Sequence, residues 1–86
     1  MKLVYTSRFE RAYRKLSAAG QKAVDEALHV FVEDLFAPAL RNHALQGKLK
    51  GIRAIKAGYD LRLLYTEEDG HTIVFFIAVG THDQVY

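Results

Sequence analysis

The sequence predicts a single α+β domain over residues 1–86, with the element order β-α-α-β-β-β. Two segments with helical periodicity follow one another in the first half of the chain, and three segments with strand periodicity follow one another in the second. This order is typical of α+β folds in which the helices cover one face of a sheet. We therefore expect a two-helix hairpin packed on one face of a four-stranded, mainly antiparallel sheet.

The first half of the chain supplies the opening strand and both helices. Residues 2–6 alternate as a strand, and Ser7 with Glu10 matches a capping box at the start of a helix that has one apolar stripe. A second, longer helix is expected from about residue 18 or 21 to about residue 35. Pro38 then ends helical structure, because a proline disfavours helical geometry in the residue before it.

The second half of the chain alternates as strands. Residues 50–57 and 59–67 are expected to pair, and a Glu-Asp-Gly turn at 68–70 leads into an apolar strand at 72–79. The last residues are expected to form one helical turn capped by Thr81. Since no further element is left to cover the second sheet face, that face is expected to carry the functional site.

Composition narrows the class of protein. Half of the 86 residues are hydrophobic and 26% are charged, which is typical of a globular domain with one core. The sequence contains no cysteine, so disulfides and thiolate metal sites are excluded. No apolar run is long enough for a signal peptide or a membrane span, and we expect a soluble, cytoplasmic protein without a membrane partner.

Basic residues are concentrated in the middle of the chain. Residues 41–62 contain six basic residues and one acidic residue, a net charge of +5, whereas the whole chain carries only +2. A basic block of this kind indicates a polyanion site. The alternative is a solvated basic surface, and composition alone does not decide between the two.

The histidines are the first candidates for chemistry. None of the four is spaced as a metal-binding pair, and no nucleotide-binding or serine-hydrolase motif occurs, so we expect no metal and no cofactor. His29 and His71 are most simply explained as surface residues. His43 and His82 are better candidates, because each lies in a polar segment with glycine nearby, outside the periodic core pattern.

Several short motifs occur together in a fixed order. A His-x-Leu-x-Gly segment starts at His43, a Lys-Gly-x-Arg segment starts at Lys50, and Asp60 opens an apolar strand that ends at Tyr65. A terminal Gly-Thr-His follows, ending at His82. In this order and spacing the chain resembles the RelE/ParE toxin superfamily over nearly its whole length. Within the superfamily it is most similar to the YafQ-type mRNA interferases.

The resemblance implies a function and partners. Toxins of this kind are metal-independent endoribonucleases that cut mRNA in the A site of the small ribosomal subunit and so inhibit translation. A cognate antitoxin protein holds the toxin inactive, and operator DNA is contacted only indirectly, through the antitoxin. For this chain we therefore expect an antitoxin and ribosome-bound mRNA as partners.

The resemblance also implies site residues. The catalytic set carried over by position is His43, Asp60 and His82, with Tyr86 as a terminal aromatic residue near the RNA. Where the YafQ branch usually has a further histidine, this chain has Lys56. Lysine suits charge stabilisation but carries protons poorly near neutral pH, because its pKa is usually about 10.4.

The chemistry of RNA cleavage assigns roles to these side chains. Histidine titrates near neutral pH, so His82 is expected as general acid, with either His43 or Asp60 as the base. Basic side chains are expected to hold phosphate. These are Lys50, Arg53, Lys56 and Arg62. For Asp60 the alternative is a salt bridge to Arg62 or Arg53 without a catalytic role.

Two other functions stay open at this point. ParE-type relatives share the fold but inhibit DNA gyrase without catalysis, and they generally lack the histidine and acid set. A catalytically weakened homologue that mainly binds its antitoxin is the other alternative, and Lys56 is its main support.

Overall fold

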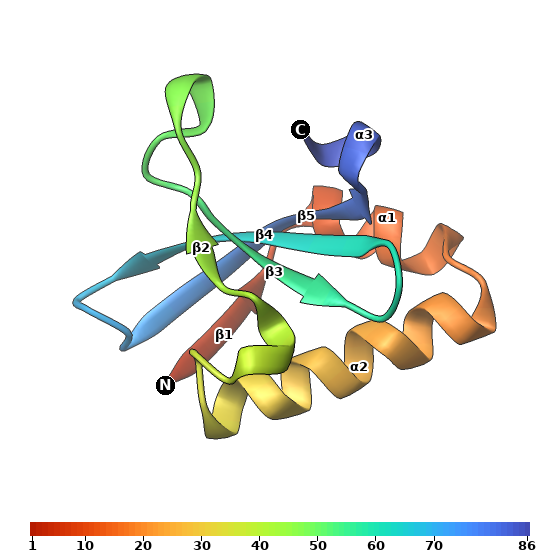
Figure 1. Ribbon diagram of the computed structural model, residues 1–86, viewed down its shortest axis with the longest axis horizontal. Coiled ribbons are helices and arrows are strands. Elements are labelled where there is room, and N and C mark those ends of the chain that lie inside the picture. The colour runs from red at the N-terminus through yellow and green to blue at the C-terminus, as the bar shows by residue number, and fades with distance from the viewer.

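A computed structural model describes residues 1–86 as three α-helices packed against a five-stranded sheet (Figure 1). The helices and strands are β1 (Lys2–Tyr5), α1 (Ser7–Lys15), α2 (Ala18–Glu33), β2 (His43–Ala44), β3 (Arg53–Ala57), β4 (Leu61–Glu68), β5 (Ile73–Thr81) and α3 (His82–Val85). Two 3₁₀ turns, η1 (Pro38–Leu40) and η2 (Gly47–Leu49), flank β2. Each helix is too short or too polar to cross a membrane.

The sheet has the strand order β1-β5-β4-β3-β2. Strand β1 pairs with β5 in parallel, and the other neighbours are antiparallel. The predicted fold class is confirmed, but the prediction of four strands is wrong by one. The additional strand, β2, has only two residues, His43 and Ala44, which pair with Ala54 and Arg53. Such a short strand shows no periodicity that a sequence pattern could reveal.

Both main helices begin at a side-chain cap. The Thr6 hydroxyl accepts a hydrogen bond of 3.2 Å from the backbone N–H of Phe9, so Thr6 is the N-cap of α1 and the predicted cap, Ser7, is already inside the helix. The Ser17 hydroxyl accepts in the same way from Gly20 and starts α2. Helix α2 ends at Glu33, two residues before the predicted end, and Pro38 begins η1.

The strand boundaries also differ from the prediction. Strand β3 begins at Arg53 rather than residue 50, because Gly51 has φ of +94°, a left-handed conformation that interrupts extended backbone. Strand β4 begins at Leu61, after a turn at residues 58–60. Strand β5 continues two residues beyond the predicted end, to Thr81.

Helices α1 and α2 cover one face of the sheet and enclose the main core, as predicted. Its centre is aromatic: the Phe31 ring of α2 meets the Tyr65 and Phe76 rings edge-on, at centroid distances of 5.1 and 5.3 Å. These three side chains are fully buried. Aromatic pairs with this geometry add about 0.5–1.5 kcal/mol each beyond the burial of their area, so they fix α2 firmly against β4 and β5.

The opposite face is not as bare as predicted. Helix α3 and the β2–β3 connection lie on this side, away from α2 (Figure 1). Val85 of α3 is buried there against Ala54, Leu64 and Ala78, which lie side by side on β3, β4 and β5. This small second cluster holds the C-terminus on the sheet and leaves polar surface beside it.

Candidate functional site

A hollow of about 390 Å³ lies on the sheet face that carries α3. The side chains that line it are Arg41, His43, Lys56, Arg62, His82 and Tyr86, and we call it the basic hollow. It contains three basic side chains and two imidazoles, and no Asp or Glu side chain lines it. A site of this composition attracts anions and offers groups that exchange protons near neutral pH.

The sheet register explains why residues from three strands meet in the basic hollow. His43 pairs with Ala54 in β3, and Lys56 lies two residues further along the same strand, so both side chains point to the same face. Lys56 in turn pairs with Arg62 in β4, and Arg62 pairs with Gly80 in β5. Paired residues share a face, so the sheet itself brings His43, Lys56 and Arg62 together.

Gly80 allows the chain to fold back over this face. A Cβ atom at position 80 would lie only 2.7 Å from Oε1 of Gln84, closer than real Cβ atoms approach. The same Gln84 oxygen accepts a hydrogen bond of 2.8 Å from the backbone N–H of Thr81, which completes a capping box at the start of α3. The predicted single turn capped by Thr81 is confirmed.

Helix α3 carries two residues of the basic hollow. The His82 and Tyr86 rings meet edge-on at a centroid distance of 4.4 Å, and Nδ1 of His82 lies 3.5 Å from the Asp83 carboxylate. Burial raises the pKa of the Tyr86 hydroxyl, and the nearby Arg62 charge acts in the opposite direction. At neutral pH Tyr86 is therefore an uncharged aromatic group that packs against His82.

His43 enters the basic hollow from β2. Its Nδ1 lies 2.8 Å from the backbone carbonyl oxygen of Arg41. Arg41 follows η1 in a left-handed conformation, with φ of +49°, and its own side chain lines the same hollow. Arg41 was not among the predicted site residues. It belonged to the basic block, but neither its unusual backbone nor its contact with His43 has a sequence signal.

Two predicted phosphate-binding residues lie elsewhere. Nε of Arg53 donates a hydrogen bond of 2.8 Å to the Asn42 side chain, and its guanidinium lies 5.5 Å from the centre of the Phe36 ring. Lys50 is exposed in the turn after η2. Neither side chain lines the basic hollow.

Asp60 does not join the two histidines. It lies in the turn between β3 and β4 and lines a different hollow, together with Tyr59 and residues of α2 such as Gly20. Strand alternation places residues 60 and 62 on one face only if the strand already includes residue 60, and β4 begins one residue later. The predicted alternative, a salt bridge of Asp60 with Arg62 or Arg53, is also not formed.

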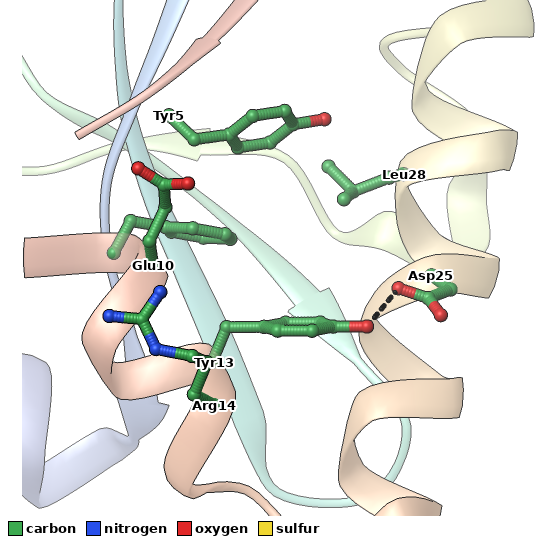
Figure 2. A pocket seen from close by; sticks show the side chains of 7 residues that line it. Tyr5, Glu10, Tyr13, Arg14, Asp25 and Leu28 are labelled. Carbon is green, nitrogen blue, oxygen red and sulfur yellow. Dashed lines mark hydrogen bonds between the residues drawn. The ribbon is translucent and has the colours of Figure 1, made fainter. Parts of the chain in front are cut away.

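Figure 2 shows another hollow, of about 320 Å³, between β1, α1 and α2. The Tyr13 hydroxyl reaches from α1 to α2 and donates a hydrogen bond of 2.7 Å to the Asp25 carboxylate, which raises the pKa of Tyr13. This hollow contains no histidine, and its one arginine, Arg14, is accompanied by the acidic side chains of Glu10 and Asp25. It lacks the groups that phosphate chemistry needs. No group of three or more potential metal ligands occurs anywhere in the chain.

Solved structures show that this arrangement of helices and strands recurs in bacterial toxins. A copper-bound mutant toxin from Helicobacter pylori is 25% identical, with a TM-score of 0.80 over 100% of this chain and 99% of that one. YafQ from E. coli strain BL21(DE3) is 20% identical, with a TM-score of 0.71 over 99% and 97% of the two chains. A chain of the toxin–antitoxin complex RelBE2 from Mycobacterium tuberculosis is 24% identical, with a TM-score of 0.67 over 94% and 90%.

Among curated proteins no sequence matches this chain. A family model, described as a bacterial toxin of type II toxin-antitoxin systems, YafQ, matches residues 1–86 without a gap at either end. The similarity of fold to YafQ, to another bacterial toxin and to a chain of a toxin–antitoxin complex agrees with that match. The chain therefore belongs to the YafQ family of bacterial type II toxin–antitoxin toxins.

Proposed function

We propose that this toxin is a metal-independent endoribonuclease that cuts mRNA on the ribosome and thereby inhibits translation. The observation that carries the proposal is the composition of the basic hollow, where two histidines lie among three cationic side chains. This combination suits the cleavage of RNA by its own 2′-hydroxyl group. Such a reaction needs one group that removes a proton, one that supplies a proton, and positive charge around the phosphate.

The residues of the basic hollow divide these tasks. His43 takes the proton from the 2′-hydroxyl, whose oxygen then attacks the adjacent phosphorus. His82 gives a proton to the departing 5′-oxygen, so the products carry a 2′,3′-cyclic phosphate and a 5′-hydroxyl. The cations of Arg41, Lys56 and Arg62 stabilise the additional negative charge on the phosphate. Asp60 lies outside the basic hollow and has no part in this proposal.

Tyr86 is proposed to contact a base next to the cleaved bond. Tyr86 is 39% exposed, lines the basic hollow and already packs against His82. Stacking of a base on an aromatic side chain is worth about 1–3 kcal/mol and does not depend strongly on sequence. Tyr86 thus orients the nucleotide beside the cleaved bond, and the ribosome brings the mRNA to the toxin.

A cognate antitoxin is the second proposed partner. Membership of a type II toxin–antitoxin family supports an antitoxin, and the mycobacterial neighbour was solved as a toxin–antitoxin complex. The cationic basic hollow favours an antitoxin segment with acidic side chains that covers it. Binding of such a segment is expected to weaken as salt increases, because salt screens exposed charges.

The test is cleavage of ribosome-bound mRNA by the purified toxin, with the new 5′ ends mapped and the RNA termini identified. Replacing His82 by Gln is expected to lower the cleavage rate by about 10²–10⁴, the usual contribution of a general acid or base. His29→Gln is the matched control, since the His29 side chain is 79% exposed on α2, outside the basic hollow.

Two outcomes would contradict the proposal. One is full cleavage by the folded His82→Gln protein, which would show that His82 is not the general acid. The other is growth arrest with intact mRNA and loss of DNA supercoiling, which would favour gyrase inhibition.

A further inference from the structure

Asn42 lies between two residues of the basic hollow, but its own side chain is used elsewhere. The Nδ2 group donates hydrogen bonds to the Leu35 carbonyl at 2.9 Å and to the Tyr65 hydroxyl at 2.7 Å. Its Oδ1 accepts from Nε of Arg53 at 2.8 Å. Both amide hydrogens and the amide oxygen are thus engaged, and Asn42 is tied to three separate parts of the chain.

The partners of Asn42 are themselves held in place. Tyr65 is fully buried in β4 and packs against the Phe31 and Phe76 rings of the main core. The Arg53 guanidinium lies over the Phe36 ring, in addition to its bond with Asn42. Because Tyr65 is buried and Arg53 is stacked on Phe36, the hydrogen bonds of Asn42 cannot shift without disturbing the packing around them. Asn42 therefore has a defined position.

The position of Asn42 fixes the peptide that precedes it. Arg41 has φ of +49° and ψ of +42°, a left-handed conformation that non-glycine residues adopt only when their surroundings impose it. This conformation directs the Arg41 carbonyl oxygen toward Nδ1 of His43, at 2.8 Å. The Arg41 N–H donates a hydrogen bond of 3.2 Å to the Pro38 carbonyl, and the side-chain bonds of Asn42 hold the chain on the other side of Arg41.

The Arg41–His43 contact determines the tautomer of the histidine. A carbonyl oxygen only accepts hydrogen bonds, so Nδ1 of His43 must carry the hydrogen. In the neutral ring the lone pair then lies on Nε2. That nitrogen is at the far end of the ring from β2, and it is the atom by which His43 can remove a proton.

We infer that Asn42 is a positioning residue, which holds the Arg41 carbonyl where it keeps His43 in the Nδ1–H form with Nε2 as the base. The inference rests on the proposed function for its kinetic consequence, but its structural part can be measured without any RNA. It also gives Arg53 a role that differs from the predicted one: Arg53 supports Asn42 instead of binding phosphate.

The first experiment reads the tautomer directly. Nitrogen-15 NMR of the purified protein at a pH well above the usual histidine pKa of about 6.5 distinguishes Nδ1–H from Nε2–H rings, and His43→Gln identifies the resonances of His43. We expect the Nδ1–H form in the native protein. In Asn42→Ala we expect a mixture in which Nε2–H predominates, because the carbonyl no longer holds its place.

The second experiment measures ribosome-dependent cleavage by the same variants. Asn42→Ala is expected to lower kcat by about tenfold, part of the contribution of a general base, while KM changes little because every cation of the basic hollow remains. Gln46→Ala is the matched control, since Gln46 is an exposed polar residue of the same connection whose side chain forms no cap hydrogen bond.

Tyr65→Phe provides an independent and milder change. It removes only the hydroxyl that accepts from Asn42 and keeps the ring in the core. We expect a smaller shift toward Nε2–H and a smaller loss of kcat in the same direction. This variant decides the question if Asn42→Ala does not fold.

The inference is wrong if the native His43 ring is found as Nε2–H, or if folded variants keep both the Nδ1–H form and the native kcat. A loss of stability with an unchanged tautomer would give Asn42 a merely structural role and would also overturn it. If the native protein cleaves no mRNA, the proposed function fails, while the tautomer measurement still decides the structural part.

Discussion

Lys56 and Arg62 are direct neighbours across β3 and β4, and both side chains line the basic hollow. Like charges at directly opposite positions of a sheet repel each other and destabilise the pair. No Asp or Glu side chain lines the hollow, and neither Lys56 nor Arg62 forms a salt bridge. The chain therefore keeps an unfavourable pair at this place, whose repulsion an anionic ligand would reduce.

Neutralising one member of this pair is expected to raise the stability of the fold and to weaken the binding of RNA. Lys56→Gln removes the repulsion and should raise the free energy of unfolding by roughly 0.2–1 kcal/mol, while weakening the binding of a non-cleavable RNA analogue. Urea unfolding and a binding titration at two salt concentrations measure the two effects. Lys22→Gln, at an exposed position of α2, is the control. If Lys56→Gln lowers both the free energy of unfolding and the affinity for RNA, the repulsion between Lys56 and Arg62 is already compensated in the native protein.

Replacing Lys56 by His makes the charge of this position depend on pH. Lysine is protonated throughout the neutral range, whereas an ordinary histidine is charged only below a pKa of about 6.5. We expect the ratio of variant to native cleavage rate to be near one at pH 6 and to fall as the pH rises to 8. A variant that is much faster than the native toxin at all pH values would instead identify this chain as a catalytically weakened member of its family.

The space beside Gly80 predicts a non-additive pair of mutations. Gly80→Ala puts a methyl group 2.7 Å from Oε1 of Gln84, and the capping box must open to admit it. A loss of about 0.5–2 kcal/mol, the usual cost of a lost cap, is expected, with a fall in cleavage because α3 carries His82. In Gly80→Ala/Gln84→Ala the contact with Oε1 is gone and the Cβ atom of residue 84 stays close, at 3.1 Å, so the double variant should lose less stability than the two single losses added together. Additive losses in thermal unfolding would argue against this explanation.

The buried tyrosine makes the fold sensitive to alkali. Burial raises the pKa of Tyr65, and the hydrogen bond from Asn42 acts in the opposite direction with a smaller effect. Because the folded state favours the protonated hydroxyl, its contribution to stability is complete below the usual tyrosine pKa of about 10 and is lost at higher pH. Urea unfolding between pH 8 and 11 should therefore show a smaller decline in Tyr65→Phe than in the native protein. Tyr59→Phe is the control, since its ring is 94% exposed.

Much of the fold could be predicted because its determinants are local. The apolar stripes of α1 and α2 and the alternation in β4 follow from residue type and spacing alone. Strand β2 could not be predicted, because its two residues form a strand only through their pairing with β3. The predicted N-cap of α1, Ser7, is one residue later than the observed one, Thr6. Both are good capping residues, and only the backbone conformation distinguishes them.

The basic hollow was predictable where residues lie within regular elements. Lys56 and Arg62 follow from strand alternation, and His82 follows from the terminal motif with its capped turn. Asp60 was assigned to the site by the family resemblance, but it lies in the turn before β4 and lines a different hollow. Arg53 and Arg41 are the same residue type in the same basic block, and only the tertiary contacts of Asn42 show that one supports the site and the other lines it.

The parallel pairing of the first strand with the last has a consequence during synthesis. Residues 2–5 of β1 pair only with residues 73–76 of β5, so β1 cannot join the sheet until β5 has been synthesised. Contacts between such distant segments form late in folding, because the intervening chain must first be ordered. His82 and Tyr86 follow β5 directly. The basic hollow, to which His82 and Tyr86 contribute, therefore forms only after β5 and α3 have been synthesised, and a shorter nascent chain has an incomplete sheet without these two side chains.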